Sequence, residues 1–177
     1  MSLIESQRAF LIYELGLLSL KASLSTRAGG APIYDASCKE HQRGEVKDSF
    51  REVLVAVQSN YANGNVSEDD HIKFINATAE LLSTKHSGTL HRKRFRFGVC
   101  QKLVNIHLKY LWVAGFVPEP PHCPIDGIVR DLAKLNYDWT TSDSHEEYAS
   151  AVSQLRELAA PRTLAVWELE EFRRRAQ

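Results

Sequence analysis

Polar and cationic side chains recur along one face of an otherwise apolar segment at residues 91–116. At about 100° per residue, one sector of this predicted helix holds amide, ammonium and indole groups: Gln101, Lys102, Asn105, Lys109 and Trp112. The remaining surface is apolar, as is typical of a helix buried among others. Two lysines beside an amide and an indole can hold an anion, with the indole as a stacking surface. The stripe is interpreted either as the solvent face of a central helix or as a ligand-binding groove.

Reactive side chains also occur in a proline-rich segment at residues 116–124. It contains four of the six prolines of the chain, Pro118, Pro120, Pro121 and Pro124. Proline fixes φ and removes a hydrogen-bond donor, so the segment is predicted to be a stiff, extended strap. The strap places His122 and Cys123 just before Asp126. It is interpreted as a structural element or as part of a site, and the sequence leaves open whether it covers the polar stripe.

His107 lies on the opposite side of the same helix, among apolar positions. A lone histidine on such a face is expected to be a core residue that is hydrogen-bonded to the backbone. A hydrolase-like site that combines His107 or His122 with Asp126 and Lys102 is an alternative. No catalytic residue is assigned, because no glycine-rich or Ser/His/Asp pattern identifies a nucleophile.

The charge of the chain is balanced overall but unevenly distributed. The net charge is zero, so the whole molecule has no sign-based attraction to nucleic acid. Residues 81–118 contain no acidic residue and seven cations: Lys85, Arg92, Lys93, Arg94, Arg96, Lys102 and Lys109. Arginine and phenylalanine alternate at residues 94–97, as in grooves that bind single-stranded nucleic acid. These cations are expected either to pair with acidic helices or to contact phosphates.

Cysteines and hydropathy favour a cytoplasmic protein that does not span a membrane. The three cysteines are widely spaced and form no disulfide framework, and no apolar run reaches the roughly 20 residues that span a bilayer. Asp35, Cys38 and His41 follow one another at three-residue spacing. A loop with this spacing has no fixed geometry and offers no fourth ligand, so neither a metal nor a cofactor is predicted.

Helical periodicity predicts the elements that position these residues. Besides 91–116, the expected helices cover residues 6–25, 44–60, 67–82, 126–135, 144–159 and a last helix from 163. Ser67, Ser144 and Thr163 are suited to cap the helices that follow them. A long connector covers residues 28–43. The prediction is a single all-α domain over residues 1–177, with about seven helices around the central helix at 91–116.

The run QKLVNIHLKYLW followed by PEPPHCPID resembles an uncharacterised group of small bacterial all-helical proteins. The likeness covers residues 97–139 and implies a bacterial, cytosolic, helical protein; no activity comes with it. A shorter likeness concerns helical ribonucleases of toxin and defence systems, which place an arginine before a histidine on a helix. Here Lys102 stands at the position of that arginine relative to His107, and lysine lacks the planar fork that holds a phosphate in two places.

These observations together favour a non-enzymatic binding or interaction module, with a protein partner or a second copy of the chain as its partner. Apolar helical faces are abundant, whereas catalytic motifs do not converge. The first alternative is binding of nucleic acid or a phosphate ligand through residues 85–109. The second is a small hydrolase or ribonuclease-like site. The candidate ligand-binding residues are Arg96, Gln101, Lys102, Asn105, Lys109, Trp112, His122 and Asp126.

Overall fold

The chain folds into seven α-helices, as predicted, and a computed structural model describes residues 2–25 and 30–172. The helices are α1 (Leu3–Leu24), α2 (Glu40–Tyr61), α3 (Glu68–Lys85), α4 (Phe97–Val113), α5 (Gly127–Ala133), α6 (His145–Ala159) and α7 (Leu164–Glu171). A 3₁₀ turn at His91–Lys93 precedes α4. The described part contains no strand, only an isolated bridge between Tyr34 and Leu90. None of its helices is long and apolar enough to cross a bilayer.

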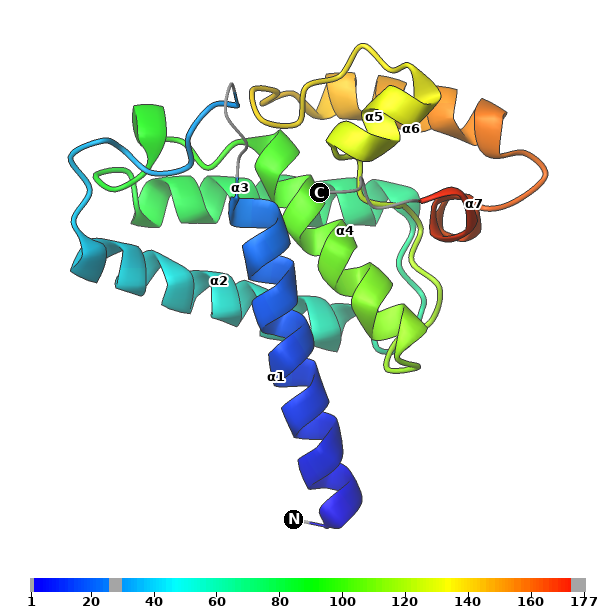
Figure 1. The fold of residues 1–177 in the computed structure, drawn as a ribbon, viewed down its shortest axis with the longest axis horizontal. Coiled ribbons are helices and arrows are strands. Elements are labelled where there is room, and N and C mark those ends of the chain that lie inside the picture. Colours follow the sequence, from blue (N-terminus) through cyan, green and yellow to red (C-terminus); the bar gives the residue numbers. More distant parts are fainter. Residues whose placement is uncertain (1, 26–29, 173–177) are drawn as a thin grey trace.

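Helix α4 is the central element, as the sequence predicts. It packs against α1, α2 and α3, and the strap, α5, α6 and α7 lie on its other side (Figure 1). All but four of its residues are buried. The N-terminal half of α1, by contrast, extends beyond the rest of the fold (Figure 1).

The central helix begins at Phe97, so the predicted start near residue 91 is wrong. Arg92 and Lys93 have positive φ angles of 51° and 61°, which no α-helix accommodates. The first amides of α4 find acceptors in the loop before α6. Phe97 N donates to Asp143 Oδ1 at 2.8 Å, and Gly98 N donates to the carbonyl of Ser142 at 3.0 Å. These bonds satisfy two of the free amides of a helix N-terminus and fix where α4 begins.

Side-chain caps fix the start of three further helices, α3, α6 and α7. The hydroxyls of Ser67, Ser144 and Thr163 each accept a backbone amide of the following turn, which confirms the predicted caps. Helix α2 starts at Glu40, four residues earlier than predicted, so the described connector is shorter than expected. The first part of the predicted connector, including residues 28 and 29, lies outside the described residues.

Candidate functional site

The polar stripe of α4 lies inside the protein, so its interpretation as a solvent face is wrong. Gln101 and Asn105 are fully buried, Lys102 is 7% exposed, and Lys109 and Trp112 are partly buried. The strap covers this face, which answers the question that the sequence left open. The Gln101 side-chain amide donates to the carbonyl of Ile125 at 2.7 Å, and its oxygen accepts from Ile125 N at 3.3 Å. The side-chain amide thus pairs with the chain that follows the prolines.

A buried hydrogen-bond network joins the stripe to three neighbouring elements. Asn105 lies at its centre: its Oδ1 is 2.9 Å from His71 Nε2 of α3, and its Nδ2 donates to Tyr148 Oη of α6 at 3.0 Å. Tyr148 Oη is 2.9 Å from His122 Nδ1 of the strap. Tyr61 of α2 contacts the other ring nitrogen of His71. The candidates Asn105, Gln101 and His122 therefore do come together, although in a filled interior.

The direction of each hydrogen bond follows from the donors available. Asn105 Oδ1 can only accept, so His71 carries its proton on Nε2 and accepts the Tyr61 hydroxyl proton on Nδ1. Tyr148 accepts from Asn105 and so donates to His122 Nδ1. His122 then carries its proton on Nε2, which lies 3.9 Å from Glu68 Oε2. The donated hydrogens therefore run in one direction, from Tyr61 through His71, Asn105 and Tyr148 to His122, and this order fixes both histidine tautomers.

Burial keeps both histidines of the network neutral at physiological pH. Desolvation, and then the neighbouring His122, lower the pKa of His71 to about 3. Desolvation, and then Arg156, lower the pKa of His122 to about 4. The two rings meet edge to face, with centroids 4.8 Å apart. A second positive charge in this space would be costly, so the network does not suit a general acid at neutral pH.

Tyr61, His71 and Tyr148 are members of the network that sequence reasoning missed. They lie on α2, α3 and α6, and the sequence analysis assigned none of them to a site. His71 follows the acidic first turn of α3, which caps the helix. One feature of the sequence could have indicated the network. Several polar residues have apolar neighbours, and polar groups that become buried require hydrogen-bond partners.

Two arginines of the basic segment, Arg94 and Arg96, are bound by acceptors of the chain itself. Arg94 pairs with Glu80 at 2.7 Å and with Asp143 at 2.6 Å. The Arg96 guanidinium is buried and donates to the carbonyls of Ala31 and Pro32. The expected pairing with acidic helices therefore holds for Arg94, through Glu80 of α3, whereas Arg96 is bound by backbone carbonyls and not by an acidic helix. Phosphate binding through residues 85–109 would depend on the exposed Arg92 and Lys93.

The two lysines of the stripe have different environments. Lys102 Nζ lies 3.8 Å from the ring centroid of Trp139, so Trp139, rather than Trp112, supplies a cation–π surface. Lys109 Nζ lies 2.7 Å from Glu168 Oε2 of α7, and Glu168 is only 2% exposed. Burial raises the pKa of Glu168 above its usual value, although Lys109 opposes this effect. Trp112 borders the small gap between this pair and the strap.

His107, His122 and Asp126 contact different partners. His107 is 1% exposed and bonds to Ser19 of α1, so its prediction as a core residue is confirmed, although its partner is a side chain and not the backbone. Asp126 Oδ1 accepts the amides of Ile128 and Val129 and so caps α5. This arrangement gives no support to the hydrolase-like alternative. Among the described residues, no group of three suitable side chains could hold a metal ion.

Seven of the thirteen exposed large apolar residues in the described part of the chain lie on α1, which the sequence analysis did not single out as a site. This helix buries its small residues Gly16, Ser19 and Ser23. It leaves seven large ones exposed: Leu3, Ile4, Phe10, Leu11, Tyr13, Leu17 and Leu18. At about 100° per residue these seven fall within one half of the helix circumference. We call them the α1 outer face.

Comparison with known proteins assigns the chain neither to a family nor to a function. Neither the protein-family models, nor the curated proteins, nor the solved structures contain a match to the chain. The resemblance to small bacterial helical proteins stays a prediction. The function must therefore be inferred from the α1 outer face, the exposed cations Arg92 and Lys93, and the buried polar network.

Proposed function

We propose that the protein is a non-enzymatic interaction module that self-associates through the α1 outer face. The observation that carries this proposal is the packing of α1, which buries Gly16, Ser19, Leu20 and Ser23 and leaves seven large apolar side chains exposed. A surface helix of a water-soluble protein normally turns most of its large apolar side chains inward. Covering this face with the same face of a second copy would remove the large apolar side chains from water.

The spacing of the exposed residues suits a helix–helix contact. Leu3, Phe10 and Leu17 form one line at seven-residue intervals, and Ile4, Leu11 and Leu18 form a second line beside it. Apolar residues repeated every seven positions keep a continuous seam facing a partner helix. The α1 outer face is thus patterned along three repeats, whereas a random apolar surface would lack this register.

The size of the α1 outer face also suits a second copy. A large apolar side chain offers roughly 200 Å² when fully exposed. The exposed fractions of the seven side chains then amount to roughly 800 Å², which is about what each partner contributes to a stable interface. The largest apolar patch on an ordinary monomer covers about 300 to 600 Å².

Polar residues between the two apolar lines define the orientation of the pair. Gln7, Glu14 and Lys21 follow one another at the same seven-residue spacing. In an antiparallel pair that overlays the whole α1 outer face, Glu14 of one copy lies beside Gln7 of the other, whereas in a parallel pair Glu14 meets Glu14. Like charges that meet at such positions disfavour an orientation, so we infer an antiparallel pair with two-fold symmetry.

Light scattering and sedimentation across a concentration series test this proposal. We expect a dimer for the native chain and a monomer for Phe10→Ser/Leu11→Ser. The matched control is Leu158→Ser, because Leu158 is 51% exposed on α6. Gln7→Lys should strengthen the dimer, because the lysine meets Glu14 of the other copy, and Gln7→Glu should weaken it. A native chain that stays monomeric at every concentration would contradict self-association.

The prediction of a cytoplasmic location accompanies this proposal. All three cysteines are free and buried. Burial raises the pKa of the Cys100 and Cys123 thiols, which keeps them protonated and unreactive. A reducing compartment suits such thiols, because they have no disulfide to form.

A further inference from the structure

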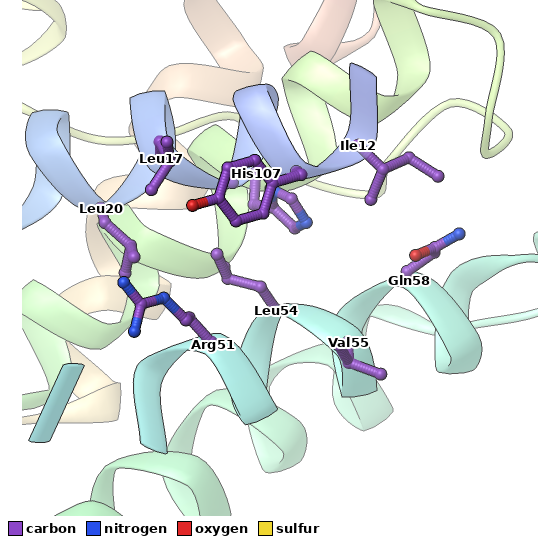
Figure 2. A pocket seen from close by; sticks show the side chains of 10 residues that line it. Ile12, Leu17, Leu20, Arg51, Leu54, Val55, Gln58 and His107 are labelled. Atoms are coloured by element: carbon purple, nitrogen blue, oxygen red, sulfur yellow. The ribbon is translucent and has the colours of Figure 1, made fainter. Parts of the chain in front are cut away.

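A pocket of about 120 Å³ opens between α1 and α2, with His107 of α4 among its lining residues (Figure 2). Its walls are mainly apolar and include Ile12, Leu17, Leu20 and Leu54. The side chains of Arg51 and Gln58 lie along α2 beside it (Figure 2). The pocket thus combines an apolar wall with a single buried imidazole.

Ser19 determines which nitrogen of His107 carries the proton. The Ser19 hydroxyl donates its one hydrogen to the carbonyl of Leu15 at 2.7 Å. Its oxygen lies 3.0 Å from Nδ1 of His107 and can therefore only accept there. The proton of the ring is consequently on Nδ1, and Nε2 presents a lone pair.

That lone pair is buried without a hydrogen-bond donor. Among the described residues, none provides a hydrogen bond to Nε2 of His107, although the atom is shielded from solvent. Burial lowers the pKa of His107 to about 4, so the ring stays neutral near pH 7. A buried acceptor without a donor is unfavourable, and a ligand that brings a donor would remove that cost.

We propose that this pocket binds a small, mostly apolar molecule with one hydroxyl group, of the class of phenols and compact alcohols, whose hydroxyl donates to Nε2 of His107. Cavities of about 150 Å³ hold the six heavy atoms of benzene, so this pocket of about 120 Å³ takes about five heavy atoms, and its open mouth leaves the remainder of a slightly larger molecule at the surface. The apolar walls take the ring or branched body, and the imidazole selects for the donor. The pocket borders the α1 outer face, which contributes Tyr13 and Leu17 to its lining, whereas Phe10 and Leu11 lie outside it. Phe10→Ser/Leu11→Ser therefore removes self-association and leaves the pocket lining unchanged, so binding measured in that variant is independent of the dimer.

Calorimetric titration with phenol and with toluene tests the proposal, because the two molecules have similar size and differ in the donor. We expect phenol to bind about tenfold more tightly than toluene, the difference that one hydrogen bond to a buried acceptor makes. In His107→Leu the preference should disappear while toluene still binds. Equal affinities in the native protein, or no binding of either molecule, would overturn the proposal.

Glycine substitutions provide a second test that does not depend on changing the histidine. A Cβ on Gly16 would lie 3.4 Å from Leu54 Cδ1, so Gly16→Ala narrows the pocket without a severe overlap. Alanine also favours the helix more than glycine does, so the fold should persist. The matched control is Gly44→Ala on α2, where an added Cβ meets nothing within 4 Å. We expect weaker phenol binding for Gly16→Ala alone, and unchanged binding there would contradict the site.

Nitrogen NMR of the His107 ring reports the contact directly if His107→Leu does not fold. In the free protein, Nε2 should show the resonance of an unprotonated ring nitrogen. Phenol should shift that resonance and toluene should leave it in place. An Nε2 resonance that phenol does not move would overturn the proposed hydrogen bond.

Discussion

Helices α1 and α4 are both rich in apolar residues, but they bury opposite faces. Helix α4 buries a row of amides and cations with partners from α3, α6, α7 and the strap. Helix α1 buries Gly16, Ser19, Leu20 and Ser23 and exposes the seven large apolar side chains of its outer face. The difference shows that the polarity of its side chains alone does not determine which face of a helix is exposed to water. Small residues allow α1 to approach α4 closely, and matched donors and acceptors make a polar face compatible with the interior.

The largest expected effect concerns the neutral histidines that border α4. Folding lowers the pKa of His71 to about 3 and of His107 and His122 to about 4, from an unfolded value near 6.5. The unfolded chain therefore binds more protons below pH 6.5, so stability is full above that pH and is lost as the pH falls towards 4. Three protons correspond to a loss of about 4 kcal/mol per pH unit at the steepest. Urea unfolding measured between pH 7.5 and 4.5 checks this slope.

A matched variant separates the histidines from the carboxylates. In His107→Leu one of the three protons is removed, so the slope between pH 6.5 and 4 should fall by about a third. Unfolding free energies that stay constant from pH 7 to pH 5 would contradict neutral, buried histidines. They would also weaken the contrast between the two helices, because the polar face of α4 would then be accessible to water.

The second expected effect is on the centre of the polar network. Asn105→Ala leaves buried His71 Nε2 without its acceptor and removes one hydrogen bond each from Tyr148 and Gln101. We expect a loss of about 3 to 5 kcal/mol in the free energy of unfolding. Chemical denaturation of Asn105→Ala beside Asn136→Ala, an exposed asparagine, measures it. A loss below about 1 kcal/mol would mean that the buried polar face contributes little to the fold.

A third expected effect tests the close approach at the start of α4. An added Cβ on Gly98 would overlap the backbone carbonyl oxygen of Trp139 and touch that of Ser142. Backbone yields less readily than a flexible side chain, so Gly98→Ala should cost about 1 to 3 kcal/mol. Gly44→Ala on α2, where the space is open, is the control and should not destabilise. Thermal unfolding of both variants distinguishes packing from helix propensity.

The sequence predicted the elements more accurately than their exposure. Periodicity located all seven helices, and serine and threonine side chains marked three caps, because both are local properties. The burial of Gln101 and Asn105 depends on partners that lie 24 to 43 residues away in the chain, which no local pattern contains. The exposure of α1 likewise depends on what the remaining helices leave uncovered. Candidate residues were therefore found in part, whereas the partners Tyr61, His71 and Tyr148 were not.

The smallest expected effect concerns Phe10 on the outer face of α1. Phe10 is 66% exposed, so Phe10→Ser should change the free energy of unfolding by less than about 0.5 kcal/mol in dilute protein. At higher concentration the native chain should gain stability over the variant, because association stabilises only the folded state. Unfolding midpoints across a dilution series measure both regimes. A large loss at every concentration would instead mean that Phe10 packs within its own chain, and the α1 outer face would then belong to the core and not to an interface.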